Sequence, residues 1–260
     1  MRGWLRMRAS TREVSGVRLC SFLAGVALLW LALASPLASY VHQFLTAHMI
    51  QHLLLMTISP ALVLLADPLK VFQLAMPPQL ARSTRDFFRI PPLPQFGKLI
   101  SNPIVCWLAS TAVLLGWHIP AIFARSFASP PLHQFEQFTF LFAGFLFWWA
   151  VVQPWPSAYT WPRWLLLLYL FLATLPCDIL SAYLTFCDRV VYAPYLDLRP
   201  NFANAVLRDQ EFAGSLMWTC ITIFYLVPAA VLTVQLLGSS AENMDRAVSE
   251  PSHVSSRTRV

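Results

Sequence analysis

The chain has 260 residues, of which 57% are hydrophobic, 14% are aromatic and only 12% are charged. Because charged residues make up roughly a quarter of soluble domains, this composition excludes an ordinary soluble domain and a disordered chain. Its five cysteines are too sparse for a disulfide scaffold. The net charge of +6 comes from short basic blocks between apolar segments, which is typical of membrane-protein loops. We therefore expect a lipid bilayer as partner and no nucleic acid.

Six apolar segments follow one another along the chain, each near or above the roughly 20 residues that a helix needs to cross a bilayer. They comprise residues 19–37, 48–66, 102–124, 133–152, 164–186 and 211–237. Helices satisfy their own backbone hydrogen bonds in lipid. The sequence therefore predicts an all-α, polytopic transmembrane bundle of about six spans. This membrane domain, residues 19–237, has an N-terminal tail, 1–18, and a C-terminal tail, 238–260.

The first segment also has features of a signal peptide. Arginines precede it, and Ala32-Leu33-Ala34 resembles a cleavage site. However, its apolar run is long for a signal peptide, and Pro36 closely follows that site. These features favour a helix that is retained in the mature protein.

The basic residues predict the orientation of the bundle. If the N-terminus is cytoplasmic, 14 of the 18 Lys and Arg residues lie in inner segments, and only Arg125, Arg189, Arg199 and Arg208 lie in outer ones. Because cytoplasmic loops carry an excess of Lys and Arg, we predict that both termini are cytoplasmic.

This topology brings the ionisable residues of the spans to one level. Every histidine except His253, which lies in the C-terminal tail, falls on the outer side, including His42 in the first outer loop. Three acids, Glu136, Asp178 and Asp209, lie in or against the spans on the same side. An ionisable group costs about 2.5–3.5 kcal/mol at a helix centre on insertion scales, so a cluster on one side indicates a function.

The second apolar segment begins with a candidate metal-binding pair. His48 and His52 are four residues apart and share a helix face, which lets two imidazoles reach one ion. Met49 and Met56 on the same segment are possible soft ligands for Cu(I). The alternative is that the histidines bond to neighbouring helices and the methionines are ordinary packing residues.

Two further histidines lie near the outer surface. His133 and Glu136 are three residues apart on one helix face, a pairing that binds metals in helical bundles. Alternatively, they form a solvated helix start. His118 precedes Ile119 and Pro120, and this arrangement is typical of a helix end.

The fifth apolar segment contains an acid well inside the span. Asp178 follows Pro176, which is expected to kink the helix and to leave the carboxyl group facing the bundle interior. Its alternative role is a hydrogen bond to a neighbouring helix. Cys177 and Cys187 could be soft ligands or form a disulfide, although inert packing is favoured for all five cysteines.

Several short motifs resemble the CtaG family of cytochrome c oxidase assembly factors in the same order. The resemblance covers residues 19–237 and is carried by Ser35-Pro36, 48–55 (HMIQHLLL), Pro60, Asp67-Pro68, 117–120 (WHIP), Leu132-His133 with Glu136, 147–149 (FWW), Val191-Tyr192, Pro194-Tyr195, 209–214 (DQEFAG) and Met217-Trp218. The chain departs from the family at Gln137, where members commonly carry a histidine. Many members also have one more N-terminal helix.

The resemblance implies a multi-pass protein of the bacterial inner membrane that helps to assemble an aa-type or caa-type oxidase. We therefore expect a non-catalytic factor that binds copper transiently and passes it to an oxidase subunit. The expected ligands are His48, His52, His118 and His133. Glu136, Asp178 and Asp209 are expected to orient the imidazoles or balance charge.

Other functions fit the same residues. Two histidines on facing helices could bind haem in a membrane redox protein. The polar cluster could also belong to a copper transporter, although no inverted repeat is apparent in the sequence. A structural scaffold for oxidase subunits would tolerate replacement of the histidines.

Overall fold

The structure is a computed structural model that describes residues 16–69, 77, 95, 99, 101–153 and 161–249. No strand occurs within these ranges. Among the described residues, five helical segments are long and apolar enough to cross a membrane, and a bent pair of helices makes a sixth candidate. The five are Gly16–Ala34 (α2), Leu45–Leu65, Pro130–Val152 (α11), Arg163–Phe186 (α12) and Pro200–Gly238. The predicted all-α membrane bundle is confirmed, and the orientation of its termini stays a prediction.

The second span contains a π-helical turn. It consists of α4 (Leu45–Leu53), the π-helix η1 (Leu54–Ile58) and α5 (Ser59–Leu65), with the Ser59 N–H donating to the carbonyl of Leu54. Pro60 has no N–H to offer the carbonyl of Met56, and its ring crowds that carbonyl. The chain accommodates Pro60 by widening the preceding turn, a feature that is frequent at functional sites.

The third predicted span is broken in two. We expected one helix over 102–124, whereas the structure has α9 (Pro103–Trp117) and α10 (Pro120–Ala128), bent by 74°. Ile119 is extended, with φ −65° and ψ 121°, because the ring of the following Pro120 disfavours helical backbone there. His118 lies directly before this break.

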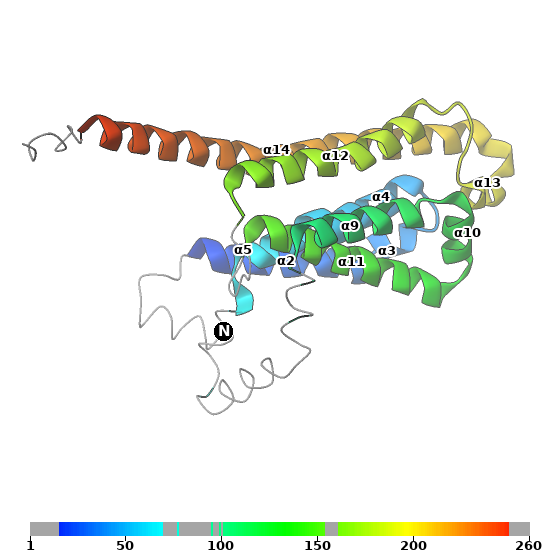
Figure 1. The fold of residues 1–260 in the computed structure, drawn as a ribbon. Coiled ribbons are helices and arrows are strands. Elements are labelled where there is room, and N and C mark those ends of the chain that lie inside the picture. The colour runs from blue at the N-terminus through cyan, green and yellow to red at the C-terminus, as the bar shows by residue number, and fades with distance from the viewer. Residues whose placement is uncertain are drawn as a thin grey trace, which may run out of the picture.

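Two long helices form one layer of the bundle (Figure 1). α12 packs along α14 (Ala203–Ser249). The span that begins with α4 contacts α14, and the helix before the bend, α9, contacts α12, whereas α2 and α11 pack on the far side of these two. A Cβ at Gly214 would approach the carbonyl of Ser181 to 3.0 Å, so glycine permits the close contact. α14 begins before and ends after the predicted span 211–237, and α12 continues through Pro176 as one helix.

Short helices gather at one end of the bundle. α3 (Leu37–Tyr40), α10 and α13 (Ala193–Leu198) lie there together in Figure 1, and the 3-10 turn η2 (Pro200–Phe202) joins α13 to α14. Tyr195 of α13 donates a hydrogen bond to the carbonyl of Val41 at 2.8 Å. This bond ties the turn before α14 to the loop before α4, next to the histidines.

Candidate metal centre

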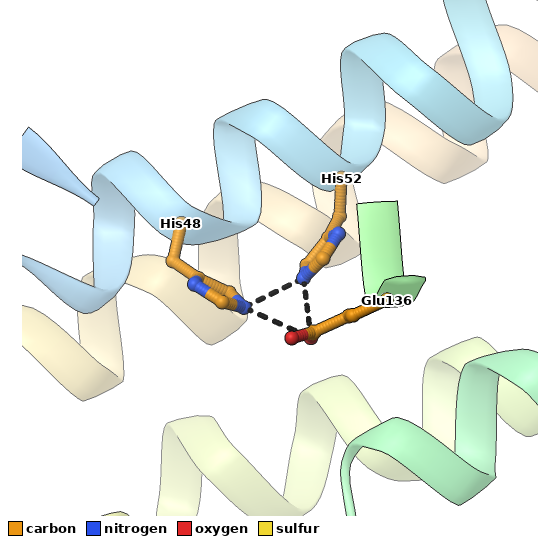
Figure 2. A group of neighbouring side chains, drawn as sticks. All are labelled: His48, His52 and Glu136. Carbon is orange, nitrogen blue, oxygen red and sulfur yellow. Dashed lines mark hydrogen bonds and ion pairs between the residues drawn. The ribbon is translucent and has the colours of Figure 1, made fainter. Parts of the chain in front are cut away.

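The two histidines of α4 lie on one face of the helix, as their spacing predicts. Both side chains are buried, and their Nε2 atoms are 2.6 Å apart. Figure 2 shows both rings projecting from the same helix toward one point. The ring of His52 also stacks on Phe140 with centroids 3.8 Å apart, which fixes its plane.

The carboxylate of Glu136 meets this pair from α11. Its Oε1 atom lies 3.4 Å from Nε2 of His48 and 3.2 Å from Nε2 of His52 (Figure 2). The three residues could each offer one ligand atom, with all these atoms within 4.8 Å of one another. Two imidazoles and a carboxylate are a ligand set that binds transition metals. We call these three residues the metal centre.

The metal centre is buried, so an unpaired charge there is energetically unfavourable. Glu136 is 1% exposed, and its Oε1 atom has no hydrogen-bond partner within the described part of the chain. The Nδ1 atoms of His48 and His52 also lack partners there. A buried carboxylate costs several kcal/mol unless it is paired. A cation between the three ligand atoms would supply that pairing, so the donor set fits a metal ion.

The second oxygen of Glu136 is held by two donors. His133 donates from Nδ1 to Oε2 at 3.2 Å, and the hydroxyl of Ser126 on α10 donates to the same oxygen. The Nε2 atom of His133 lies 2.9 Å from the side-chain amide of Gln137, which donates to it. Both nitrogens of His133 are therefore used in orienting Glu136, and neither faces the metal centre as a free ligand.

Gln137 also links the centre to α2. Its amide lies 3.3 Å from Oε1 of Gln51, and Gln51 in turn donates to the carbonyl of Ala32 at 2.7 Å. The amide of Gln137 thus fixes the tautomer of His133, because a nitrogen that accepts a hydrogen bond cannot carry the proton. At the position where the CtaG family commonly has histidine, this chain has a hydrogen-bond donor.

His118 lies at the break between α9 and α10 with one nitrogen unused. Its Nδ1 atom is 2.6 Å from the carbonyl of Leu114, which can only accept, so Nδ1 carries the proton. In a neutral ring Nε2 then keeps its lone pair. This Nε2 atom is buried and has no partner in the described ranges. The side chain is held in the tautomer that a metal ligand requires.

Five histidines form a continuous row from the surface inward. Ring centroids lie 5.1 Å apart between His42 and His133, 5.6 Å between His133 and His48, and 4.3 Å between His48 and His52. His118 follows at 6.3 Å from His52. Only His42 is exposed. Partial burial lowers the pKa of His42, and His133 lowers it further, which keeps this imidazole neutral at pH 7.

The remaining predicted residues lie in three different places. Asp209 caps the N-terminus of α4, with Oδ2 accepting from the N–H of Leu45 at 2.7 Å. Asp178 is half-buried on α12, and its Oδ1 atom has no hydrogen-bond partner among the described residues. Met49 and Met56 line a cavity that also borders His52.

Sequence reasoning missed Ser126 and Gln51 as parts of the site. Ser126 gives no signal, because a serine in a helix usually bonds to its own backbone. Gln51 does give one: it is an uncharged polar residue within an apolar span, and it is completely buried. A polar side chain at such a position calls for a partner.

Comparisons with known proteins agree with the family resemblance. The sequence model of the family described as cytochrome c oxidase caa3 assembly factor matches residues 1–239. Two relatives, "Uncharacterized protein Mb0105" of Mycobacterium bovis and "Uncharacterized protein MT0111" of Mycobacterium tuberculosis, are each 24% identical over 252 residues. Each alignment covers 89% of this chain but only 35% of the relative. No solved structure matches the chain.

Proposed function

The chain belongs to the cytochrome c oxidase caa3 assembly factor family, and on that premise we propose that it binds copper transiently and passes it to an oxidase subunit. The observation that carries the proposal is the convergence of His48, His52 and Glu136 at one buried point. Copper is the cargo, and no catalytic step is proposed.

A three-ligand centre suits a factor that must release its ion. Closed structural sites have four protein ligands, whereas sites that exchange a ligand keep a position open. His48 and His52 supply two imidazoles, and Glu136 supplies a carboxylate that offsets the charge of the ion. The open position lets a further ligand enter the coordination sphere and displace the ion from the centre.

The roles that we propose for two residues differ from those expected from the sequence. Glu136 is a ligand, because its Oε1 atom faces both imidazoles. His133 positions Glu136, because both of its nitrogens already have partners. Asp209 acts at the start of α4, one turn before His48, and holds the helix that presents the pair.

The exposed end of the histidine row is the proposed point of first contact. His42 is exposed, and its ring is 5.1 Å from that of His133. His133 in turn lies 5.6 Å from His48. His42 is therefore the exposed histidine of the row, separated from the metal centre by the ring of His133, and we propose it as the residue that an incoming ion binds first. By the predicted orientation this end faces outward from the bacterial inner membrane.

The test is a double substitution, His48→Ala with His52→Ala, in cells that assemble the oxidase. We expect loss of oxidase activity and of copper from membranes, with the protein present at the wild-type level in immunoblots. Gln43→Ala, an exposed neighbour of His42, is the control and should leave both unchanged. Normal activity and copper content in the double variant would refute the ligand proposal.

Haem binding and copper transport are alternatives that use the same residues. The Nε2 atom of His52 lies 3.2 Å from Oε1 of Glu136. To bind a haem iron through Nε2, the ring of His52 would have to turn away from this carboxylate. A Soret band in the purified protein would support haem and displace the copper proposal. Transport would change the copper content of whole cells, whereas delivery to the oxidase would change only the copper of the oxidase.

A further inference from the structure

A cavity inside the bundle adjoins the metal centre on its inner side. It is bordered by α4, η1, α9, α11, α12 and α14. Its wall is mostly apolar and aromatic, but it also contains side chains with sulfur or imidazole donors. These are Met49, His52, Met56, His118, Cys177 and Met217.

The methionine thioethers of the described structure are concentrated at this cavity. All three methionines whose side chains the structure describes line it, although they come from α4, η1 and α14. Cys177, from α12, adds a buried thiol. Ordinary packing would distribute flexible methionines among the gaps of the core, whereas here they share one cavity. Thioethers are neutral, soft ligands that select Cu(I) over hard or divalent ions.

A second observation points to a ligand in the same cavity. His118 lines it, and the Nε2 atom of this residue is buried without a partner in the described ranges. Its tautomer is fixed by the hydrogen bond from Nδ1 to Leu114. A buried acceptor with no donor nearby is costly, and a metal ion would satisfy it.

We propose that this cavity is a second metal site, selective for a soft monovalent cation such as Cu(I), with the thioethers of Met56 and Met217 and Nε2 of His118 as ligands. The proposal rests on the proposed function, since the ion reaches the cavity through the metal centre. His52 belongs to the centre and also lines the cavity, so the two sites are adjacent.

The two sites differ in ligand chemistry, and this difference makes them separable. The metal centre has nitrogen and oxygen ligands, which accept Zn(II) as well as copper. The cavity offers thioethers, which bind Zn(II) poorly and Cu(I) or Ag(I) well. Of the ions that bind at the metal centre, the cavity should therefore accept monovalent ones and exclude Zn(II).

The test is titration of the purified full chain in detergent with Cu(I), under reducing conditions with a chromophoric chelator as competitor. We expect Met56→Leu with Met217→Leu to bind one equivalent of Cu(I) less than the wild type, with Zn(II) binding unchanged. Leucine keeps the size and apolar character of methionine, so the fold should persist. X-ray absorption of the Ag(I)-loaded wild type should show sulfur ligands, and these should disappear in the double variant.

The outcomes separate this inference from the proposed function. If the methionine variant binds as much Cu(I) as the wild type and His48→Ala with His52→Ala binds less, the cavity site is refuted and the metal centre stands. If only the methionine variant loses an equivalent, the cavity site stands and the centre is refuted.

Discussion

The carboxylate of Asp209 accepts a hydrogen bond from the backbone N–H of Leu45 at 2.7 Å. The helix that carries both histidines of the metal centre therefore begins on a side chain that is 164 residues away in sequence. Phe44, the N-cap residue of α4, offers no side-chain acceptor. Asp209 supplies the missing cap and also accepts from the hydroxyl of Thr46 at 2.6 Å.

Removing this cap should loosen α4. We expect Asp209→Ala to lower the free energy of unfolding by about 1–2 kcal/mol, as loss of a helix cap does, and to weaken copper binding without changing the number of ions bound. Asp209→Asn keeps one acceptor oxygen and should cost less. Unfolding by SDS in mixed micelles measures the effect, and Asp197→Asn, on exposed α13 surface, is the control. Equal losses for Asp197→Asn and Asp209→Ala would contradict the capping role.

The roles of Glu136 and His133 can be separated by affinity. His133→Asn removes a residue that positions the carboxylate, and such changes cost about 10–100-fold in metal affinity. Glu136→Gln removes a ligand and its charge, so the metal affinity of this variant should fall further than that of His133→Asn. Competition with a chelator measures both, and Gln134→Ala, exposed on the same turn of α11, should bind normally. A larger loss of metal affinity in His133→Asn than in Glu136→Gln would show that His133 is itself a ligand.

The packing of α11 on the π turn predicts a contrast between two glycines. A Cβ at Gly144 would lie 2.5 Å from the carbonyl oxygen of Met56, whereas one at Gly116 would meet nothing within 4 Å. We expect Gly144→Ala to destabilise the protein by about 1–3 kcal/mol, as overpacking does. Gly116→Ala should be neutral or slightly stabilising. Thermal unfolding in detergent measures the stability of both variants. Equal stabilities would show that the π turn moves to accommodate the added methyl group at no cost.

Much of the fold was predictable because bilayer thickness sets helix length. The apolar segments around α11 and α12 were placed within a few residues, since each run of apolar side chains ends at polar or proline residues. The predicted span 102–124 runs through the break at His118, because apolar residues continue on both sides of it, although the Ile119-Pro120 pair that follows His118 is typical of a helix end. Hydropathy does not report the restriction that a proline places on the backbone of the residue before it.

The members of the candidate site were more predictable than their roles. The four-residue spacing of His48 and His52 was enough to place both on one face. The exchange of roles between Glu136 and His133 depends on two other side chains. Ser126 donates to Oε2 of Glu136, and Gln137 donates to Nε2 of His133. Sequence spacing gives no information on such partners from other turns and helices, so the ligand atom that remains free could not be deduced.

His42 offers a kinetic prediction. His42→Ala should slow the loading of copper several-fold while leaving the equilibrium affinity unchanged, because His42 is exposed and lies outside the metal centre. Rapid-mixing experiments that follow transfer from a Cu(I)–chelator complex measure the rate. Gln43→Ala, beside it in the same loop, should load at the wild-type rate. An unchanged rate in His42→Ala would place the point of first contact elsewhere.

The direction of delivery depends on the orientation of the bundle. The 14 inner Lys and Arg residues against four outer ones predict that alkaline phosphatase fused after Ser129, at the end of α10, is active outside the cytoplasm. Green fluorescent protein fused after Val260 should fluoresce, because it folds in the cytoplasm. The opposite pattern would put the exposed His42 and the metal centre on the cytoplasmic side. The histidine row would then open toward the cytoplasm, and delivery to an oxidase subunit from the outer face would be refuted even if copper binds at His48 and His52.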